Sequence, residues 1–237
     1  MKNILIFGGS SDIGISLANY LKHIGNNVMV TYYKHKVSDI ESMKCDIRNE
    51  IEIENTFKYF LDKYKKIDII INMAAISLDN QLLDITKEDM MDVLEVNLVG
   101  SFLTSKIYSK YIADGMIVNI SSTDGIDTYN EYNMPYSISK AAMLFMSKNI
   151  SMCTSNKVIC ICPNWIDSDS TRNIDEYYLD NELKRINQSR LITKDELNES
   201  IYKIVKAATS VLEQTPPDPY PAGLSPVSLL RGSCFCG

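Results

Sequence analysis

The sequence predicts an α/β protein in which a doubly wound parallel sheet forms a single domain. Short apolar runs of strand length alternate along the 237-residue chain with longer segments whose apolar residues recur at helical spacing. This alternation is typical of parallel strands joined by crossover helices. A glycine-rich turn joins the first apolar run to the first helical segment, which indicates a nucleotide-binding arrangement. The length and the 45% hydrophobic content suit one large core.

Composition and charge exclude several classes of function. The net charge is −6 and no block of Lys and Arg forms a basic stripe, so we expect no nucleic-acid partner. No apolar run has membrane-spanning length, and the run at residues 4–7 is too short for a signal peptide. We therefore expect a cytoplasmic protein without membrane association. Six cysteines without a Cys-x-x-Cys pair, together with two histidines, favour reduced thiols and no metal site.

The first unit of the chain is a strand, a turn and a helix. Residues 4–7 are predicted to form a buried strand, residues 8–14 the glycine-rich turn, and residues 15–24 a helix that Gly25 ends. This order directs backbone N–H groups and a helix N-terminus at a phosphate. The alternative is a tight turn that holds no ligand.

The end of the second predicted strand, residues 27–32, bears on the choice of cofactor. In a parallel dinucleotide-binding sheet this end contacts the adenosine ribose, where a carboxylate would repel a 2′-phosphate. The residues here are Tyr33, Lys34 and Lys36, and the first acid is Asp39. The two lysines favour NADP(H), with NAD(H) as the alternative cofactor. A solvated loop with incidental lysines is the other interpretation.

The next segments continue the alternation. A short strand at residues 42–45 follows too closely for a crossover helix, and Asp46 and Ile47 come at its end, where an adenine could rest. A helix is predicted at residues 50–64 and a strand at 67–71, and the small residues of 72–75 allow a cofactor to approach the backbone.

A long helix is predicted at residues 87–111, with Thr86 as its N-cap. Asn97 lies in its middle among apolar neighbours, where an amide is usually hydrogen-bonded and structural. Gly100, in the same helix, indicates close packing or a kink.

The second half of the chain carries the candidate catalytic side chains. The strand at residues 116–120 delivers Ser121 and Ser122 to its carboxyl end, the edge at which open α/β sheets bind ligands. Tyr136 and Lys140 follow on a helix that Pro135 begins, and their spacing places them on one face, one turn apart. An ammonium near a phenol lowers the pKa of the phenol and helps it to transfer a proton. Taken alone, the pair is also what a solvated helix face would contain.

The remaining elements are a strand at residues 158–162, a polar and acidic segment at 169–188 that reads as a helical lid, and a helix at 191–208. These positions complete six strand and helix units, which predict right-handed crossovers.

Several short motifs, in this order and spacing, resemble the short-chain dehydrogenase/reductase family over about residues 1–208, and most closely its bacterial 3-oxoacyl-[acyl-carrier-protein] reductase branch of fatty acid biosynthesis. They are the turn at residues 8–14, the run at 45–47, the run at 72–75, Asn97, the run at 120–122, the pair Tyr136 and Lys140, and the run at 163–166. The resemblance implies a Rossmann-type fold that acts as an NAD(P)-dependent oxidoreductase.

The resemblance also implies roles for individual residues, starting with a catalytic tetrad of Asn97, Ser122, Tyr136 and Lys140. Tyr136 would protonate the substrate oxygen and Ser122 would stabilise its developing charge. Lys140 would lower the Tyr136 pKa and hold the nicotinamide ribose, and Asn97 would keep its helix kinked around a relay water. The cofactor would be held by Gly8, Ser10, Ser11, Asp12, Ile13, Gly14, Tyr33, Lys34, Asp46, Ile47, Asn72, Ala74, Tyr136, Lys140, Pro163, Ile166 and Ser168.

Two departures from the family pattern stand out. Asp12 replaces the second glycine of the phosphate turn, which we expect to be tolerated if its side chain caps the helix. Residues 1–213 are expected to form the reductase domain, whereas residues 214–237 contain five of the seven prolines and are predicted to form an irregular tail without the terminal strand of the family. One hypothesis is that a frameshift, a fusion or read-through replaced the native end.

The sequence therefore favours an NADP(H)-dependent enzyme that reduces a 3-oxoacyl thioester or a similar β-keto compound, carried on a small molecule or on an acyl carrier. A non-catalytic nucleotide-binding or redox-sensing protein is the alternative. A sugar epimerase or dehydratase is disfavoured, because no segment could form the extra substrate domain. The resemblance also implies a homo-oligomer, a tetramer or dimer that the altered tail would weaken.

Overall fold

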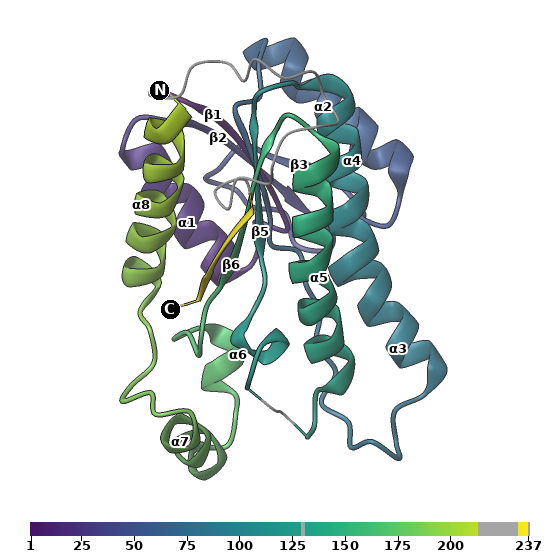
Figure 1. The fold of residues 1–237 in the computed structure, drawn as a ribbon, viewed down its shortest axis with the longest axis vertical. Coiled ribbons are helices and arrows are strands. Elements are labelled where there is room, and N and C mark those ends of the chain that lie inside the picture. The colour runs from purple at the N-terminus through teal and green to yellow at the C-terminus, as the bar shows by residue number, and fades with distance from the viewer. Residues whose placement is uncertain (129–130, 213–231, 237) are drawn as a thin grey trace.

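The computed structural model describes residues 1–128, 131–212 and 232–236, and within them seven parallel strands form one sheet (Figure 1). The strands lie in the order β3-β2-β1-β4-β5-β6-β7. Their bounds are β1 Asn3–Phe7, β2 Asn27–Tyr32, β3 Ser42–Lys44, β4 Ile69–Asn72, β5 Met116–Ile120, β6 Lys157–Cys162 and β7 Gly232–Cys236. The predicted doubly wound parallel sheet is confirmed.

Helices cover both faces of the sheet (Figure 1). On one face lie α1 (Asp12–His23) and α8 (Lys194–Leu212); on the other lie α2 (Glu50–Tyr64), α4 (Ser101–Tyr111) and α5 (Met134–Cys153). Alternate strand residues serve the two cores, as in β4, where Ile69 and Ile71 pack toward α1 and α8 while Ile70 packs toward α2 and α4. Strands that are buried on both faces appear in a sequence as continuous apolar runs, and these runs allowed the strands to be predicted.

The predicted helix starts and stops are present. Thr86 caps α3 (Lys87–Leu94) with a complete capping box, and α5 begins at Met134 with Pro135 in its first turn. Gly25 follows α1 at a φ of 91°, the left-handed conformation that ends a helix readily. As predicted, the connection between β2 and β3 contains no crossover helix.

The predicted single helix at residues 87–111 is interrupted. Between α3 and α4 lies a π-helical segment, η1 (Glu95–Gly100). A Cβ on Gly100 would lie 2.7 Å from Cγ1 of Ile47, so this turn packs closely against the loop after β3. Of the two alternatives suggested by Gly100, close packing or a kink, the close packing is found.

The segment predicted as a helical lid forms α6 (Asp169–Arg172) and α7 (Glu176–Arg185). A short 3-10 turn, η2 (Thr123–Gly125), follows β5 directly. All three elements come after the carboxyl ends of strands and therefore surround the edge at which a ligand would bind.

The prediction that the terminal strand is absent is wrong. β7 pairs in parallel with β6, from Val158 opposite Gly232 to Cys162 opposite Cys236. The prediction rested on proline, yet the last proline is Pro226, so residues 232–236 can donate and accept along their whole length. An edge strand also needs a partner on one side only. Residues 214–231 and Gly237, the rest of the predicted irregular tail, lie outside the described residues.

Candidate active site

A cleft of about 1470 Å³ lies at the carboxyl edge of the sheet. The strand order reverses between β1 and β4, and such a switch point is where open α/β sheets bind ligands. Most predicted site residues line this cleft: Gly8, Ser10, Ser11, Asp12, Ile13, Tyr33, Lys34, Asp46, Ile47, Ala74, Ser122, Tyr136, Lys140, Pro163, Ile166 and Ser168. Gly14, Asn72 and Asn97 do not.

The glycine-rich turn packs so closely at its glycines that these positions have no room for a Cβ atom. Gly8 has a φ of 77°, and a Cβ there would lie 2.3 Å from Cα of Ala74. A Cβ on Gly14 would lie 2.6 Å from Cα of Gly9, so Gly14 packs beneath the turn. Its N–H donates to Oγ of Ser11, the N-cap of α1, at 3.1 Å. Residues of this turn line the cleft at the N-terminus of α1, a position that fits a nucleotide diphosphate.

The adenosine end of the cleft holds a cation that the sequence analysis missed. Arg48 donates from Nε to Oδ1 of Asp46 at 2.9 Å and from Nη2 to Oδ2 at 2.8 Å. Its guanidinium lies 5.6 Å from the ring centroid of Tyr33. Hydrogen bonds from Arg48 hold the pKa of Asp46 below its usual value. The signal was the position of Arg48 two residues after Asp46, on the same strand end as the acid.

Tyr136 and Lys140 meet on α5 beside the end of β5. Nζ of Lys140 lies 5.3 Å from the Tyr136 ring centroid and donates to the carbonyl of Ile120 at 2.8 Å. The Ser122 hydroxyl lies close enough to the Tyr136 phenol to lower its pKa. Ser121 faces elsewhere, because its hydroxyl donates to the Lys140 carbonyl at 2.8 Å. The structure therefore places Ser122, the serine selected from the sequence, beside the phenol.

The pKa of Tyr136 shifts opposite to the predicted direction. Burial raises it, the charge of nearby Asp124 adds to the increase, and the hydrogen bond from Ser122 only partly offsets them. Burial also lowers the pKa of Lys140 to about 8. The predicted lowering of the Tyr136 pKa by Lys140 does not contribute to this shift, and desolvation of the phenol decides its direction. Tyr136 is accordingly protonated at neutral pH, which is the state that a general acid requires.

Asn97 acts on the site from behind the cleft. It is fully buried in η1, where Oδ1 accepts from the Ile76 N–H at 2.8 Å. Nδ2 donates to the Ile76 carbonyl and to Oγ of Ser139, both at 3.0 Å. One amide thus ties the loop after β4 to the turn of α5 that precedes Lys140. Asn97 holds other residues in position and does not face the cleft.

Asn72 belongs to a buried polar network beneath the cleft. Its Nδ2 donates to Oδ1 of Asn119 at 2.8 Å, and its Oδ1 accepts from Oγ1 of Thr104 at 2.7 Å. Asn119 in turn donates to Oγ of Ser147 at 2.8 Å. Asn72 is fully buried and does not line the cleft, so we assign its side chain to joining β4 and β5 to α4 and α5.

Asp124 is a second residue that the sequence analysis missed. It lies two positions after Ser122 and lines the cleft. Burial, followed by the charge of Glu182 on α7, raises its pKa to about 6. Its position two residues after the candidate serine was the signal that could have identified it.

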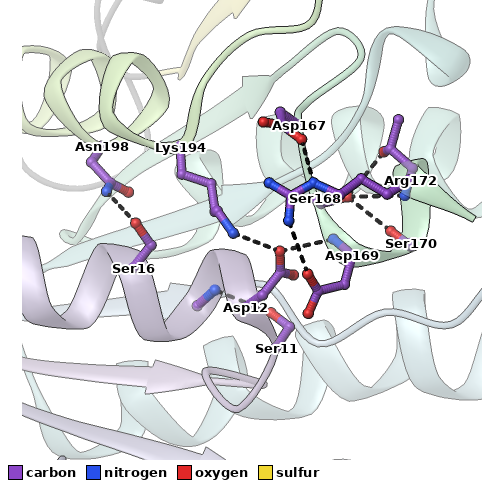
Figure 2. A network of polar contacts seen from close by, with 12 residues as sticks. Ser11, Asp12, Ser16, Asp167, Ser168, Asp169, Ser170, Arg172, Lys194 and Asn198 are labelled. Carbon is purple, nitrogen blue, oxygen red and sulfur yellow. Dashed lines mark hydrogen bonds and ion pairs between the residues drawn. The ribbon is translucent and has the colours of Figure 1, made fainter.

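Figure 2 shows how Asp12 connects three elements. Its Oδ2 accepts hydrogen bonds from the Asp169 N–H and from Nζ of Lys194, both at 2.9 Å. The condition under which we expected Asp12 to be tolerated, capping of α1 by its side chain, is not met, because Ser11 is the cap and Asp12 is the first helical residue. The Ser168 hydroxyl caps α6 next to this contact.

In the part of the chain that the structure describes, no cluster of three or more His, Cys, Asp or Glu side chains is arranged to hold a metal ion. None of the helices described there is long and apolar enough to cross a membrane.

A family model described as Enoyl-(Acyl carrier protein) reductase matches residues 8–213. Among named relatives, a 3-oxoacyl-[acyl-carrier-protein] reductase of Synechocystis is 29% identical over 189 residues, covering 72% of this chain and 76% of the relative. A carbonyl reductase family member 4 of Xenopus laevis is 30% identical over 216 residues, covering 85% of this chain and 90% of the relative.

Solved structures agree on the fold. The ligand-free aldohexose dehydrogenase of Thermoplasma acidophilum superposes with a TM-score of 0.77 at 20% identity and covers 93% of this chain and 97% of its own. A short chain dehydrogenase from Bacillus anthracis gives 0.77 at 24% identity, with 86% and 88% covered.

Proposed function

The chain belongs to the short-chain dehydrogenase/reductase family of oxidoreductases, and we propose that it uses NADP(H) to reduce the carbonyl of a 3-oxoacyl thioester or similar β-keto compound to an alcohol. The observation that carries the proposal is the meeting of the Ser122 hydroxyl, the protonated Tyr136 phenol and the buried Lys140 at one edge of the cleft. The three groups supply a proton donor and a hydrogen bond at one point.

The cleft fits a dinucleotide. The turn at residues 8–14 lines the cleft and begins α1, which suits a diphosphate. Lys34 lines the adenosine end and supports NADP(H) over NAD(H), because a 2′-phosphate would meet its charge there, whereas the nearby Arg48 is paired with Asp46. When bound, the cofactor supplies the hydride.

The side chains provide the proton chemistry. Tyr136 donates its phenolic proton to the carbonyl oxygen as negative charge develops on that oxygen, and Ser122 hydrogen-bonds the same oxygen. Lys140, held by the Ile120 carbonyl, lies within charge range of the tyrosinate that forms and stabilises it. Asn97 keeps α5 and the loop after β4 in register around them.

The substrate class is supported by the names of the relatives. Two of them are a 3-oxoacyl-[acyl-carrier-protein] reductase and a carbonyl reductase, which favours a carbonyl substrate attached to an acyl carrier or free as a small molecule.

A nucleotide-binding protein without catalytic activity is the second candidate. It is favoured by Asp12, whose carboxylate stands in the turn that would receive the diphosphate. This candidate predicts binding of NADPH without oxidation of the cofactor on any carbonyl compound.

The test compares NADPH oxidation with acetoacetyl thioester for the wild type and Tyr136→Phe, with NADH in parallel. Loss of the general acid is expected to lower kcat by about 10²- to 10⁴-fold. Tyr59→Phe, at an exposed tyrosine on α2 that lies outside the cleft, is the matched control. Wild-type rates in Tyr136→Phe would rule out the proposed acid, and NADPH binding without turnover by the wild type would support the second candidate.

A further inference from the structure

The contact between Asp12 and Lys194 joins the nucleotide turn to a helix 182 residues away. Asp12 is the first residue of α1, and its Oδ2 also accepts from the N–H of Asp169, the residue that begins α6 (Figure 2). One carboxylate oxygen therefore receives both an ammonium from α8 and a backbone N–H from the lid segment. Among the described residues, no other residue of the nucleotide turn forms a hydrogen bond to α6 or α8.

The packing of α8 on α1 fixes Lys194 in this place. Lys194 and Asn198 are one turn apart on α8, and Asp12 and Ser16 are one turn apart on α1. Nδ2 of Asn198, which is 1% exposed, donates to Oγ of Ser16 at 2.8 Å. Two side-chain contacts, Lys194 with Asp12 and Asn198 with Ser16, thus set the register of α8 on α1. The packing of these helices therefore directs the Lys194 ammonium to Asp12.

The charge of Asp12 needs this partner. Burial acts to raise the pKa of Asp12, but hydrogen bonds from Lys194, Asp169 and Ile13 and the charge of Lys194 lower it overall. The carboxylate is therefore ionised at neutral pH. The other cation nearby, Arg172, is already paired with Asp167 at 2.8 Å and lies 3.6 Å from Asp169. Lys194 alone among these neighbours is left to neutralise Asp12.

We propose that Lys194 sets the affinity of the cofactor site: its ammonium cancels the Asp12 carboxylate, so that the turn accepts the diphosphate of a dinucleotide while Asp12 still holds the lid segment. This inference rests on the proposed function. Without Lys194, the anionic carboxylate would lie in the turn that receives a second anion, and the two would repel each other. The net charge of the turn, rather than its glycine content, then sets the affinity.

The experiment measures NADPH binding to the full-length protein by calorimetry for four variants. Lys194→Ala is expected to weaken binding about fivefold, which corresponds to about 1 kcal/mol for a partly screened charge. Asp12→Asn removes the charge but keeps an acceptor for the Asp169 N–H, so it should bind NADPH at least as well as the wild type. In Asp12→Asn/Lys194→Ala the loss caused by Lys194→Ala should disappear.

Lys203→Ala is the matched control, because Lys203 lies on the same helix and pairs with Glu199 at an exposed site. The Lys194→Ala defect should also shrink at high salt, where the repulsion is screened. Equal affinities for Lys194→Ala and Lys203→Ala would overturn the inference, as would a double variant as weak as Lys194→Ala.

Two further measurements distinguish a failure of this inference from a failure of the proposed function. Wild-type binding that does not depend on Lys194 defeats the inference alone, whereas failure of the wild type to bind NADPH or NADH defeats both. Amide hydrogen exchange without cofactor tests the contact itself: exchange at residues 167–172 should be faster in Asp12→Ala than in Asp12→Asn. Equal exchange in those two variants would contradict the role of Asp12 in holding the lid segment.

Discussion

At the scale of the residue, burial and the neighbouring side chains together set the pKa of the Tyr136 phenol. The negative charge of Asp124 acts to raise the pKa of both Tyr136 and Lys140. Most of the residues that the sequence and the family resemblance selected line the cleft, because they follow parallel strands that end at one edge. They did not predict the roles of Arg48 or Lys194, since each role depends on a partner, Asp46 or Asp12, that only the folded chain brings into contact.

Asp124→Asn is expected to stabilise the protein at pH 7. The folded-state pKa of Asp124 is about 6, above the usual 3.8, so the folded state favours the neutral carboxyl. Stability from this group is fully present below about pH 4 and is lost as the pH rises through 6. The variant removes the loss, so its Tm should exceed that of the wild type at pH 7, and the difference should shrink toward pH 4.

Asp127→Asn, at an exposed acid in the same loop, is the control for this measurement and should leave Tm unchanged at both pH values. A Tm advantage of Asp124→Asn that is equally large at pH 4 would show that the raised pKa is not its cause.

At the scale of the element, apolar periodicity predicted most strands and helices within a few residues, because burial on a sheet or helix face imposes that period. It could not predict η1. The π-helical turn accompanies the bonds that Asn97 makes to Ile76 and Ser139, which are tertiary contacts absent from any local pattern. The prediction for the C-terminal tail was wrong for a different reason. It was based on the prolines, although residues 232–236 form β7 after the last proline.

Gly100→Ala tests the packing of η1 against the adenosine end of the cleft. The new Cβ would lie 2.7 Å from Cγ1 and 2.8 Å from Cγ2 of Ile47, so the branched side chain must shift. Overpacking of this kind typically costs about 1–3 kcal/mol, and denaturant unfolding should show a loss in that range. Because Ile47 lines the cleft, we also expect weaker NADPH binding.

Gly25→Ala serves as the comparison. Gly25 has a positive φ but no heavy atom within 4 Å of the added Cβ, so this variant should lose stability through backbone strain and keep wild-type NADPH affinity. A Gly100→Ala protein with unchanged stability would contradict the packing described here.

At the scale of the whole molecule, an apolar face stands open on α4 and α5. Leu98, Val99, Phe102, Ala142, Phe145 and Met146 line a shallow groove there. Phe145 is 70% exposed and Phe102 is 45% exposed, and faces of this kind in a folded domain mark contact surfaces. We propose that this face joins two copies of the chain in a dimer or tetramer, and that residues 1–213 form the reductase domain that assembles.

Phe145→Glu should break this contact, because a carboxylate in an apolar interface would be desolvated without a partner. Size-exclusion chromatography with light scattering should show a lower mass for this variant than for the wild type. Ile51→Glu, at a residue 72% exposed on α2, should leave the mass unchanged. A monomeric wild type, or an undiminished mass in Phe145→Glu, would rule out this interface.

Trp165 is the one tryptophan of the chain, and it lines the cleft between β6 and the lid segment. Its backbone is fastened by Gln188, which accepts from its N–H at 3.2 Å and donates to its carbonyl at 2.9 Å. Its indole N–H has no hydrogen-bond partner among the described residues. Tryptophan fluorescence of the unlabelled protein therefore comes from a single ring beside the cleft. A change in its emission wavelength would report ligand entry at that position alone.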